Sequence, residues 1–214
     1  MPSRSRIRVE EIARHPAFRR LVGPGGPDDR AGIAVDLRYA GTNNFAGRCL
    51  YRDLDCAWLR IEAAAGLAEA ARWLAARRPG WRLLVLDALR PHRVQEAIWA
   101  EVAGTPDAAY FADPAAGSMH SYGMAVDVTL LDAHGREAGA AEMGSGFDEM
   151  SEASHPALHA EHLASGRLSA GQVALRELLR QAMSAGGFAG IATEWWHFDH
   201  GPRERVRREF PLVE

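Results

Sequence analysis

Apolar residues recur along the chain with the periods of strands and helices. Residues 33–39 (IAVDLRY) partly alternate between apolar and polar, which predicts a half-buried strand, and the apolar run 81–87 (WRLLVLD) predicts a central strand. Between Asp55 and about Arg78, apolar positions lie three and four residues apart, so we expect a helix with Asp55 as its N-cap. Pro79-Gly80 ends that helix.

The second half of the chain predicts two more helices and two more strands. They are a helix from Pro91 to about Val102, a strand from Met124 to Leu131, a helix from a Ser169–Gln172 capping box to Gly186-Gly187, and a strand that includes residues 192–198. The connections vary too much for a regular doubly wound pattern. We therefore expect an α+β fold, with one mainly antiparallel sheet flanked by helices.

Composition and charge place the chain among ordinary globular proteins. Its 214 residues fit a single domain, 1–214, in which we expect about the first 30 residues to be peripheral. Apolar residues make up 47% and the net charge is −3, so nothing favours a nucleic acid or an anionic membrane as a partner. With no apolar run of membrane-spanning length and no signal-peptide pattern, we expect a cytoplasmic location. The two cysteines, Cys49 and Cys56, are expected to be reduced, partly buried and inert.

The segment SMHSYGMAVD, residues 118–127, contains two candidate metal ligands. A fully extended chain would separate His120 from Asp127 by roughly 23 Å, at about 3.3 Å per residue, whereas the ligands of one zinc ion lie about 2 Å from it. The chain must therefore reverse between the two residues if they share an ion, and Gly123 can adopt the backbone angles that a reversal needs. A solvated turn followed by a strand with an exposed aspartate is the alternative interpretation.

The segment EWWH, residues 194–197, adds a carboxylate and a third candidate ligand. A glutamate beside two tryptophans indicates a partly dry pocket, in which the pKa of Glu194 would rise toward neutrality. His197 together with His120 and Asp127 would leave a fourth position for water, as in catalytic zinc sites. In a flat strand, residues 194 and 197 face opposite sides, so a bend or bulge must bring both to the metal. A tryptophan-rich core strand with polar ends is the alternative.

Both segments resemble signatures of the zinc D-Ala-D-Ala peptidases, Ser-x-His-x-x-Gly-x-Ala-x-Asp and Glu-x-x-His. The chain is also similar to the D-alanyl-D-alanine dipeptidases of the vancomycin-resistance type (the VanX family) at residues 36–47 (DLRYAGTNNFAG), 86–95 (LDALRPHRVQ) and 143–155 (MGSGFDEMSEASH). The similarity extends from about residue 33 to 200. It implies the α+β fold shared with the zinc D-Ala-D-Ala carboxypeptidases and the hedgehog signalling domain.

The resemblance implies a site with one zinc ion per chain. By that resemblance His120, Asp127 and His197 would be the zinc ligands, and Glu194 would be the base that activates a zinc-bound water. These are the same four residues that the two segments bring forward on chemical grounds.

The resemblance also implies three residues that act on the substrate. Arg90 would stabilise the transition state, Asp148 would bind the free ammonium of the dipeptide, and Ser118 would help to hold the substrate near its carboxylate. Leu89 stands where the family usually has a tyrosine, which we expect to affect packing more than chemistry. From the residues alone, Arg90 could equally form a surface ion pair and Asp148 could be a solvated carboxylate.

The function implied by the resemblance is hydrolysis of the dipeptide D-Ala-D-Ala to two D-alanines. The alternative is a carboxypeptidase or endopeptidase that acts on peptidoglycan peptides, which Asp148 and the absence of a secretion signal disfavour. A zinc domain that binds a partner without catalysis is a second alternative. The presence of both Glu194 and Arg90 disfavours it.

Overall fold

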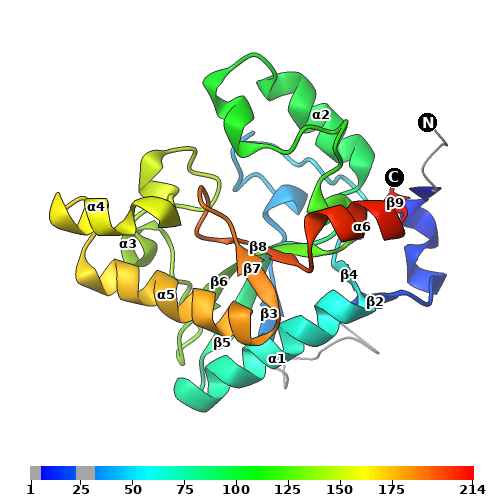
Figure 1. Ribbon diagram of the computed structural model, residues 1–214. Helices are drawn as coiled ribbons and strands as arrows, with labels where there is room; N and C mark the ends of the chain where they lie inside the picture. The colour runs from blue at the N-terminus through cyan, green and yellow to red at the C-terminus, as the bar shows by residue number, and fades with distance from the viewer. Residues whose placement is uncertain (1–5, 23–31) are drawn as a thin grey trace.

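A five-stranded sheet runs through the centre of the molecule (Figure 1). The structure is a computed structural model that describes residues 6–22 and 32–214. The strands follow the order β3 (Ile33–Val35), β5 (Arg82–Asp87), β6 (Ala125–Leu131), β8 (His197–His200) and β7 (Phe188–Gly190). β3 runs parallel to β5, and the other neighbours are antiparallel. The predicted α+β class with a mainly antiparallel sheet is therefore confirmed.

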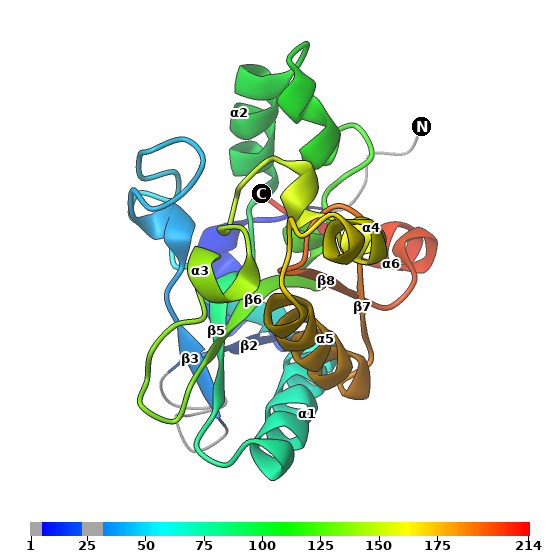
Figure 2. The same cartoon turned by 90° about the vertical axis from the view of Figure 1, so that its left-hand side faces the viewer.

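Two long helices, α1 (Ile61–Arg77) and α5 (Ala170–Ala185), cover one face of the sheet (Figure 2). Leu67 of α1, Leu179 of α5 and Val126 of β6 belong to the same buried core. The two helices approach closely where Gly66 meets Gly186, since a Cβ atom on Gly66 would lie 2.3 Å from the carbonyl oxygen of Gly186. This packing leaves the opposite face of β6 free for polar side chains.

The remaining helices are short and lie around the edges of the sheet. They are α2 (His92–Val102), α3 (Ala140–Met143), α4 (His159–Ala164) and α6 (Arg203–Glu209), with 3-10 helices at Val9–Arg14, Arg38–Ala40, Pro106–Tyr110, Met119–Tyr122, Glu152–Ser154 and Pro156–Leu158. The predicted helices after Pro91 and Ser169 are confirmed, and the Ser169 side chain accepts a hydrogen bond from the backbone N–H of Gln172 at 3.2 Å. No helix in the described part of the chain is long and apolar enough to span a bilayer.

The predicted helix from Asp55 begins later than the pattern indicated. β4 (Trp58–Arg60) is a strand that pairs antiparallel with β2 (Phe18–Arg20), and α1 begins only at Ile61. The N-cap is therefore Arg60 and not Asp55, whose carboxylate instead accepts a hydrogen bond from Arg20 Nε at 2.8 Å. The pairing partner of β4 lies far away in the chain, so a local apolar pattern could not reveal the strand.

Two predicted strands are also shorter than expected. β3 ends at Val35, and the chain then turns into the 3-10 helix Arg38–Ala40. β8 begins only at His197 and extends to His200, and residues 191–196 form the connection from β7. Trp195 and Trp196 in that connection are buried, so their apolar character reflects core packing rather than a strand.

A small parallel sheet joins the two ends of the described chain. β1 (Arg6–Ile7) pairs with β9 (Leu212–Val213). Leu89 is fully buried in a cluster of apolar residues from these ends and from β2 and β4: Ile7, Val9, Ile12, Phe18, Trp58 and Val213. The leucine that departs from the family pattern therefore has a packing role.

The two cysteines differ in their surroundings. Both are free, but Cys56 is buried, as expected, whereas Cys49 is exposed rather than partly buried. Burial raises the pKa of the Cys56 thiol well above its ordinary value. Cys56 thus stays protonated, and a protonated thiol is a poor nucleophile.

The chain reverses at Gly123, between the 3-10 helix Met119–Tyr122 and β6. Gly123 has φ 68° and ψ 29°, which is the left-handed region. A Cβ atom there would lie 2.9 Å from Phe18 Cε1 and 3.3 Å from the backbone nitrogen of Arg60. Gly123 therefore permits both the backbone conformation and the close approach of β2 and β4, as the sequence predicted for the reversal.

We predict that Gly123→Ala lowers the free energy of unfolding by about 2–4 kcal/mol, because the left-handed conformation and the contact with Phe18 both penalise a side chain. Gly166→Ala is a matched control: Gly166 has φ +74°, and nothing lies within 4 Å of its Cβ position. It should cost only about 1 kcal/mol. Urea denaturation of both variants measures the difference, and equal losses would show that the close approach at Gly123 is unimportant.

Candidate active site

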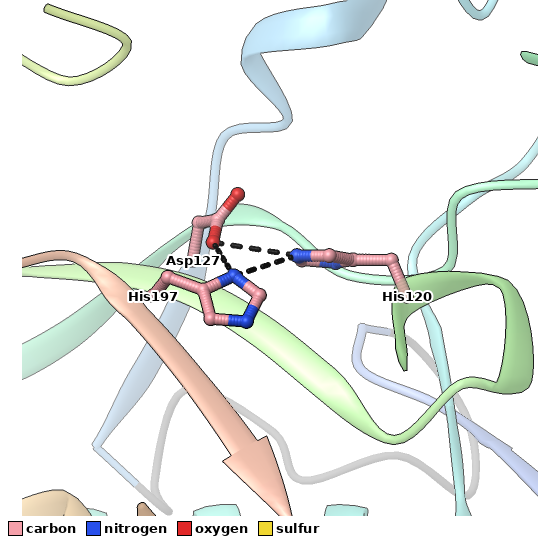
Figure 3. Close-up of side chains that lie close together, drawn as sticks. All are labelled: His120, Asp127 and His197. Carbon is pink, nitrogen blue, oxygen red and sulfur yellow. Dashed lines mark hydrogen bonds and ion pairs between the residues drawn. The ribbon is translucent and has the colours of Figure 1, made fainter. Parts of the chain in front are cut away.

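Three side chains from separate elements point toward one another (Figure 3). Val126 and Val128 of β6 belong to the core formed with α1 and α5, so Asp127 between them points to the opposite face. Asp127 lies on β6 and His197 opens β8, and the strand register pairs these two residues directly. Residues opposite each other in antiparallel strands point to the same face. His120 comes from the 3-10 helix Met119–Tyr122, and the turn at Gly123 brings it back beside β6. The structure thus brings together the three predicted ligand residues.

The facing atoms of these side chains form a nearly equilateral triangle. His120 Nε2 lies 3.2 Å from His197 Nδ1 and 3.4 Å from Asp127 Oδ1, and His197 Nδ1 lies 3.0 Å from Asp127 Oδ1. A tetrahedral ion with bonds of about 2.0–2.1 Å would separate its ligand atoms by about 3.3 Å. The three residues are buried and could hold a metal ion without rearrangement.

Asp127 is in the ionisation state that a metal ligand requires. Burial alone would raise its pKa, but the charges and hydrogen bonds of His120 and His197 outweigh burial and lower the pKa well below the ordinary value. Carboxylates bind metals in the deprotonated form. Asp127 therefore offers a ligand oxygen without first having to lose a proton.

Hydrogen bonds behind the triangle fix which nitrogen of each histidine faces it. His120 Nδ1 donates to the carbonyl oxygen of Ala88 at 2.8 Å, and His197 Nε2 donates to Asp199 Oδ1 at 2.9 Å. Asp199 Oδ2 in turn accepts from Arg203 Nε at 2.5 Å. Burial alone would lower the pKa of His197, but the charges of Asp199 and Asp127 outweigh burial and raise the pKa, so metal binding there releases a proton. In the neutral histidines, the lone pairs of His120 Nε2 and His197 Nδ1 face the triangle, an arrangement that orients histidine ligands in metal sites.

Glu194 lies beside the triangle without belonging to it. Its Oε2 atom is 4.0 Å from His197 Nδ1. Glu194 precedes β8, and the chain bends at Trp195 and Trp196 between them. The bend expected from the sequence is therefore present, and strand alternation does not apply to Glu194. Burial raises the pKa of Glu194 to about 7, against the opposing effect of His197. Such a carboxyl can exchange a proton near neutral pH.

Arg90 is held rigidly at the wall of the site. Its Nε and Nη2 donate to Asp87 Oδ2 at 3.0 and 2.7 Å, and its Nη1 donates to Gln95 Oε1 at 3.0 Å. The guanidinium also stacks over the ring of Tyr39, 4.8 Å from its centroid. Arginine has five N–H donors, and the bonds within the described chain use three of them, so two can serve a ligand. Arg90 is buried, so the surface ion pair considered from the sequence is not formed.

Asp148 has an unusual backbone conformation and few partners. Its φ is 57°, in the left-handed region. Its carboxylate accepts hydrogen bonds from the Tyr39 hydroxyl at 3.4 Å and from the backbone N–H of Phe45 at 3.2 Å. Burial, followed by the charge of Asp127, raises the pKa of Asp148 to about 8. A partly buried carboxyl without a cation beside it is a ready partner for a positively charged ligand group.

One cavity of about 270 Å³ joins these groups. It is lined by all seven residues singled out from the sequence, namely Arg90, Ser118, His120, Asp127, Asp148, Glu194 and His197. Sequence reasoning gave no role to Asp199 or Tyr39, which hold His197 and Asp148. Asp199 carried a usable signal, because it lies two residues after His197 and therefore shares its face of the strand. For Tyr39 the sequence offered no such signal beyond its place in residues 36–47, which resemble the family.

Comparison with known proteins agrees with this geometry. The model of a peptidase family described as D-Ala-D-Ala dipeptidase matches residues 30–214. A D-alanyl-D-alanine dipeptidase of Escherichia coli (strain K12) is 37% identical over 167 residues, covering 78% of each chain. A D-alanyl-D-alanine dipeptidase of Streptomyces coelicolor is 32% identical over 201 residues, 86% of this chain and 94% of the relative. A solved structure of the LD-carboxypeptidase LdcB aligns with 73% of this chain and 65% of the LdcB chain, with a TM-score of 0.43 and 17% sequence identity.

We predict that Asp199→Asn weakens metal binding about 10- to 100-fold, because a neutral amide no longer supports the basicity and orientation of His197. Competition with a chromophoric chelator measures the dissociation constant. Asp132→Asn is the control, since Asp132 pairs with Arg136 at the surface, away from the cavity. An unchanged dissociation constant for Asp199→Asn would mean that the bond to His197 plays no part in holding the ion.

We predict that Asp148→Asn stabilises the metal-free protein increasingly as the pH rises from about 4 to about 8. The pKa of Asp148 is about 8 in the folded protein and about 3.9 in an unfolded chain. Ionisation over this interval therefore disfavours the folded state, so wild-type stability falls with rising pH, and asparagine removes the loss. Asparagine also tolerates the left-handed conformation.

The expected gain in the free energy of unfolding of Asp148→Asn over wild type reaches about 2 kcal/mol above pH 8, after allowance for partial exposure of the carboxyl. Chemical denaturation of both proteins at several pH values measures it. A stability difference that does not change between pH 4 and pH 9 would contradict the raised pKa of Asp148.

Proposed function

Because the chain belongs to the D-Ala-D-Ala dipeptidase family of peptidases, we propose that it hydrolyses the dipeptide D-Ala-D-Ala to two D-alanines. The observation that carries this proposal is the meeting, in one cavity, of the ligand triangle, the Glu194 carboxyl and the unpaired Asp148 carboxyl. At about 270 Å³ the cavity is at the small end for ligand pockets. Such a size suits a very short peptide.

The metal that we propose is zinc, one ion per chain, held by His120, Asp127 and His197. Two imidazoles and one carboxylate with an open fourth position form a ligand set typical of catalytic zinc, and the triangle of ligand atoms has matching dimensions. Zinc bound there would supply Lewis acidity, which lowers the pKa of a water molecule and polarises a carbonyl group.

Glu194 is the proposed general base. It accepts a proton from the attacking water as the water adds to the peptide carbonyl, and it later returns that proton to the leaving amine. Two features support this role. Glu194 lies 4.0 Å from a ligand atom yet outside the triangle, and its pKa of about 7 lets it both take and give a proton near neutrality.

Arg90 is the proposed stabiliser of the negative charge that develops on the carbonyl oxygen. Its guanidinium faces the cavity with two N–H groups unused by Asp87 and Gln95. The bonds to those two residues hold the guanidinium still, so little reorganisation is needed when charge develops. A buried, preorganised cation has a larger effect there than one in water.

Asp148 and Ser118 are the proposed substrate-binding residues. A free ammonium group placed against Asp148 would pair with a carboxylate that has no cation of its own, and this pairing selects peptides with a free N-terminus. Ser118 is buried and lines the same cavity, where its hydroxyl could bond the substrate near its carboxylate. The proposed partner is therefore a small dipeptide; the cytoplasmic location and the absence of nucleic-acid and membrane partners stay predictions.

A substrate panel tests the proposed function directly. We expect the zinc-loaded protein to hydrolyse D-Ala-D-Ala at least about 100-fold more efficiently, by kcat/KM, than an N-acylated tripeptide that ends in D-Ala-D-Ala, because acylation removes the charge that Asp148 would bind. L-Ala-L-Ala tests the stereochemical preference in parallel. Preferential hydrolysis of the acylated tripeptide would replace the proposal with the carboxypeptidase alternative.

We predict that Glu194→Gln lowers kcat by about 100- to 10,000-fold, because proton transfer is lost while the isosteric side chain keeps the cavity intact. Metal analysis serves as the control: the variant should still bind one equivalent of zinc, since Glu194 is not a ligand. Near-native turnover by a zinc-loaded Glu194→Gln protein would rule out the assigned role.

A further inference from the structure

Arg203 is a second guanidinium at the cavity. It opens α6 and lines the same cavity as the ligand triangle. Its side chain is 49% exposed, whereas that of Arg90 is only 8% exposed. Among the described residues that line the cavity, these two are the arginines, and the more accessible of them is Arg203.

The orientation of Arg203 is set from behind. Its Nε donates to Asp199 Oδ2, and the other oxygen of Asp199 accepts from His197. An arginine bound to one carboxylate through Nε still carries N–H groups on its two terminal nitrogens, arranged to bind a second carboxylate in a bidentate manner. The described part of the chain gives those terminal groups no hydrogen-bond partner.

Arg203 and Asp148 reach the cavity from different elements, Arg203 from the start of α6 and Asp148 from the segment after α3. In both views of the fold, α6 and α3, which precedes Asp148, lie on opposite sides of β8 (Figures 1 and 2). α6 is also fixed to the segment that carries Ser118, because Arg207 donates to the carbonyl oxygen of Gly117 at 3.1 Å. The cavity is therefore lined by a carboxyl from the segment after α3, and by a cation and a serine hydroxyl from two segments that are bonded to each other.

We propose that Arg203 binds the free C-terminal carboxylate of the substrate, with Ser118 beside it, while Asp148 binds the ammonium at the other end. This inference rests on the proposed function and narrows its substrate class to peptides that have both charged ends within one small cavity. The same guanidinium restrains Asp199, so the carboxylate site and the metal ligand His197 share one hydrogen-bonded chain. The alternative is that Arg203 only holds Asp199 in place.

The experiment compares D-Ala-D-Ala with its C-terminal amide in the zinc-loaded protein and in the variants Arg203→Gln and Arg205→Gln. Arg205 is the matched control, because it lies on the same helix, pairs with Glu209 and does not line the cavity. We expect Arg203→Gln to lower kcat/KM for the dipeptide about 10- to 100-fold and to leave that for the amide nearly unchanged. Arg205→Gln should match the wild type for both compounds.

Metal content and affinity give the second readout. The proposal requires Arg203→Gln to retain its zinc. If Arg203→Gln lowers kcat/KM equally for the dipeptide and the amide, Arg203 only holds Asp199 in place. A weakened zinc affinity that accounts for the lower kcat/KM would lead to the same conclusion. If the amide is turned over too slowly to measure, its inhibition constant is compared instead, and it should be the same in wild type and Arg203→Gln.

Two wild-type results separate this inference from the proposed function. A wild-type protein that hydrolyses amide and dipeptide equally well does not recognise the carboxylate, which overturns the role of Arg203 alone. A zinc-loaded wild-type protein that hydrolyses neither compound overturns the proposed function itself.

Discussion

The pairing of β6 with β8 places Asp127 opposite His197, and the remainder of the site is arranged around these two side chains. A slip of one residue in this register would turn Asp127 toward the core formed with α1 and α5 and expose apolar side chains such as Val126 in its place. The apolar face of β6 therefore determines the position of a polar ligand. The left-handed turn at Gly123 then supplies His120 as the third corner.

The charges of the site fall into two groups. Asp127 and Arg90 are buried with partners, and those partners keep both groups ionised despite burial. For Glu194 and Asp148, burial outweighs the nearby positive charges, so their pKa values rise to about 7 and about 8. Unpaired buried carboxyls are costly to a fold. Here they are the groups to which the proposed mechanism assigns a proton and an ammonium, so lower stability accompanies the chemistry.

The sequence predicted the three residues of the triangle because their chemistry and the reversal at Gly123 are local features. It also predicted β5, β6, α2 and α5, whose apolar periods and caps lie within single elements. It failed at residues 55–60 and 191–196, because pairing with β2 and burial of Trp195 and Trp196 depend on distant parts of the chain. The bend expected between Glu194 and His197 is present at Trp195 and Trp196. Asp199 and Arg203 needed the register of β8 and the position of α6 before their contacts could be seen.

We propose that two imidazoles and one carboxylate form a preorganised triangle that holds a single ion. X-ray absorption spectroscopy of the protein loaded with one equivalent of zinc tests it most directly. We expect a four-coordinate zinc with only nitrogen and oxygen neighbours at about 2.0–2.1 Å, including the scattering pattern of two imidazoles. A sulfur neighbour at about 2.3 Å, or fewer than two imidazoles, would contradict the claim that His120, Asp127 and His197 hold the ion.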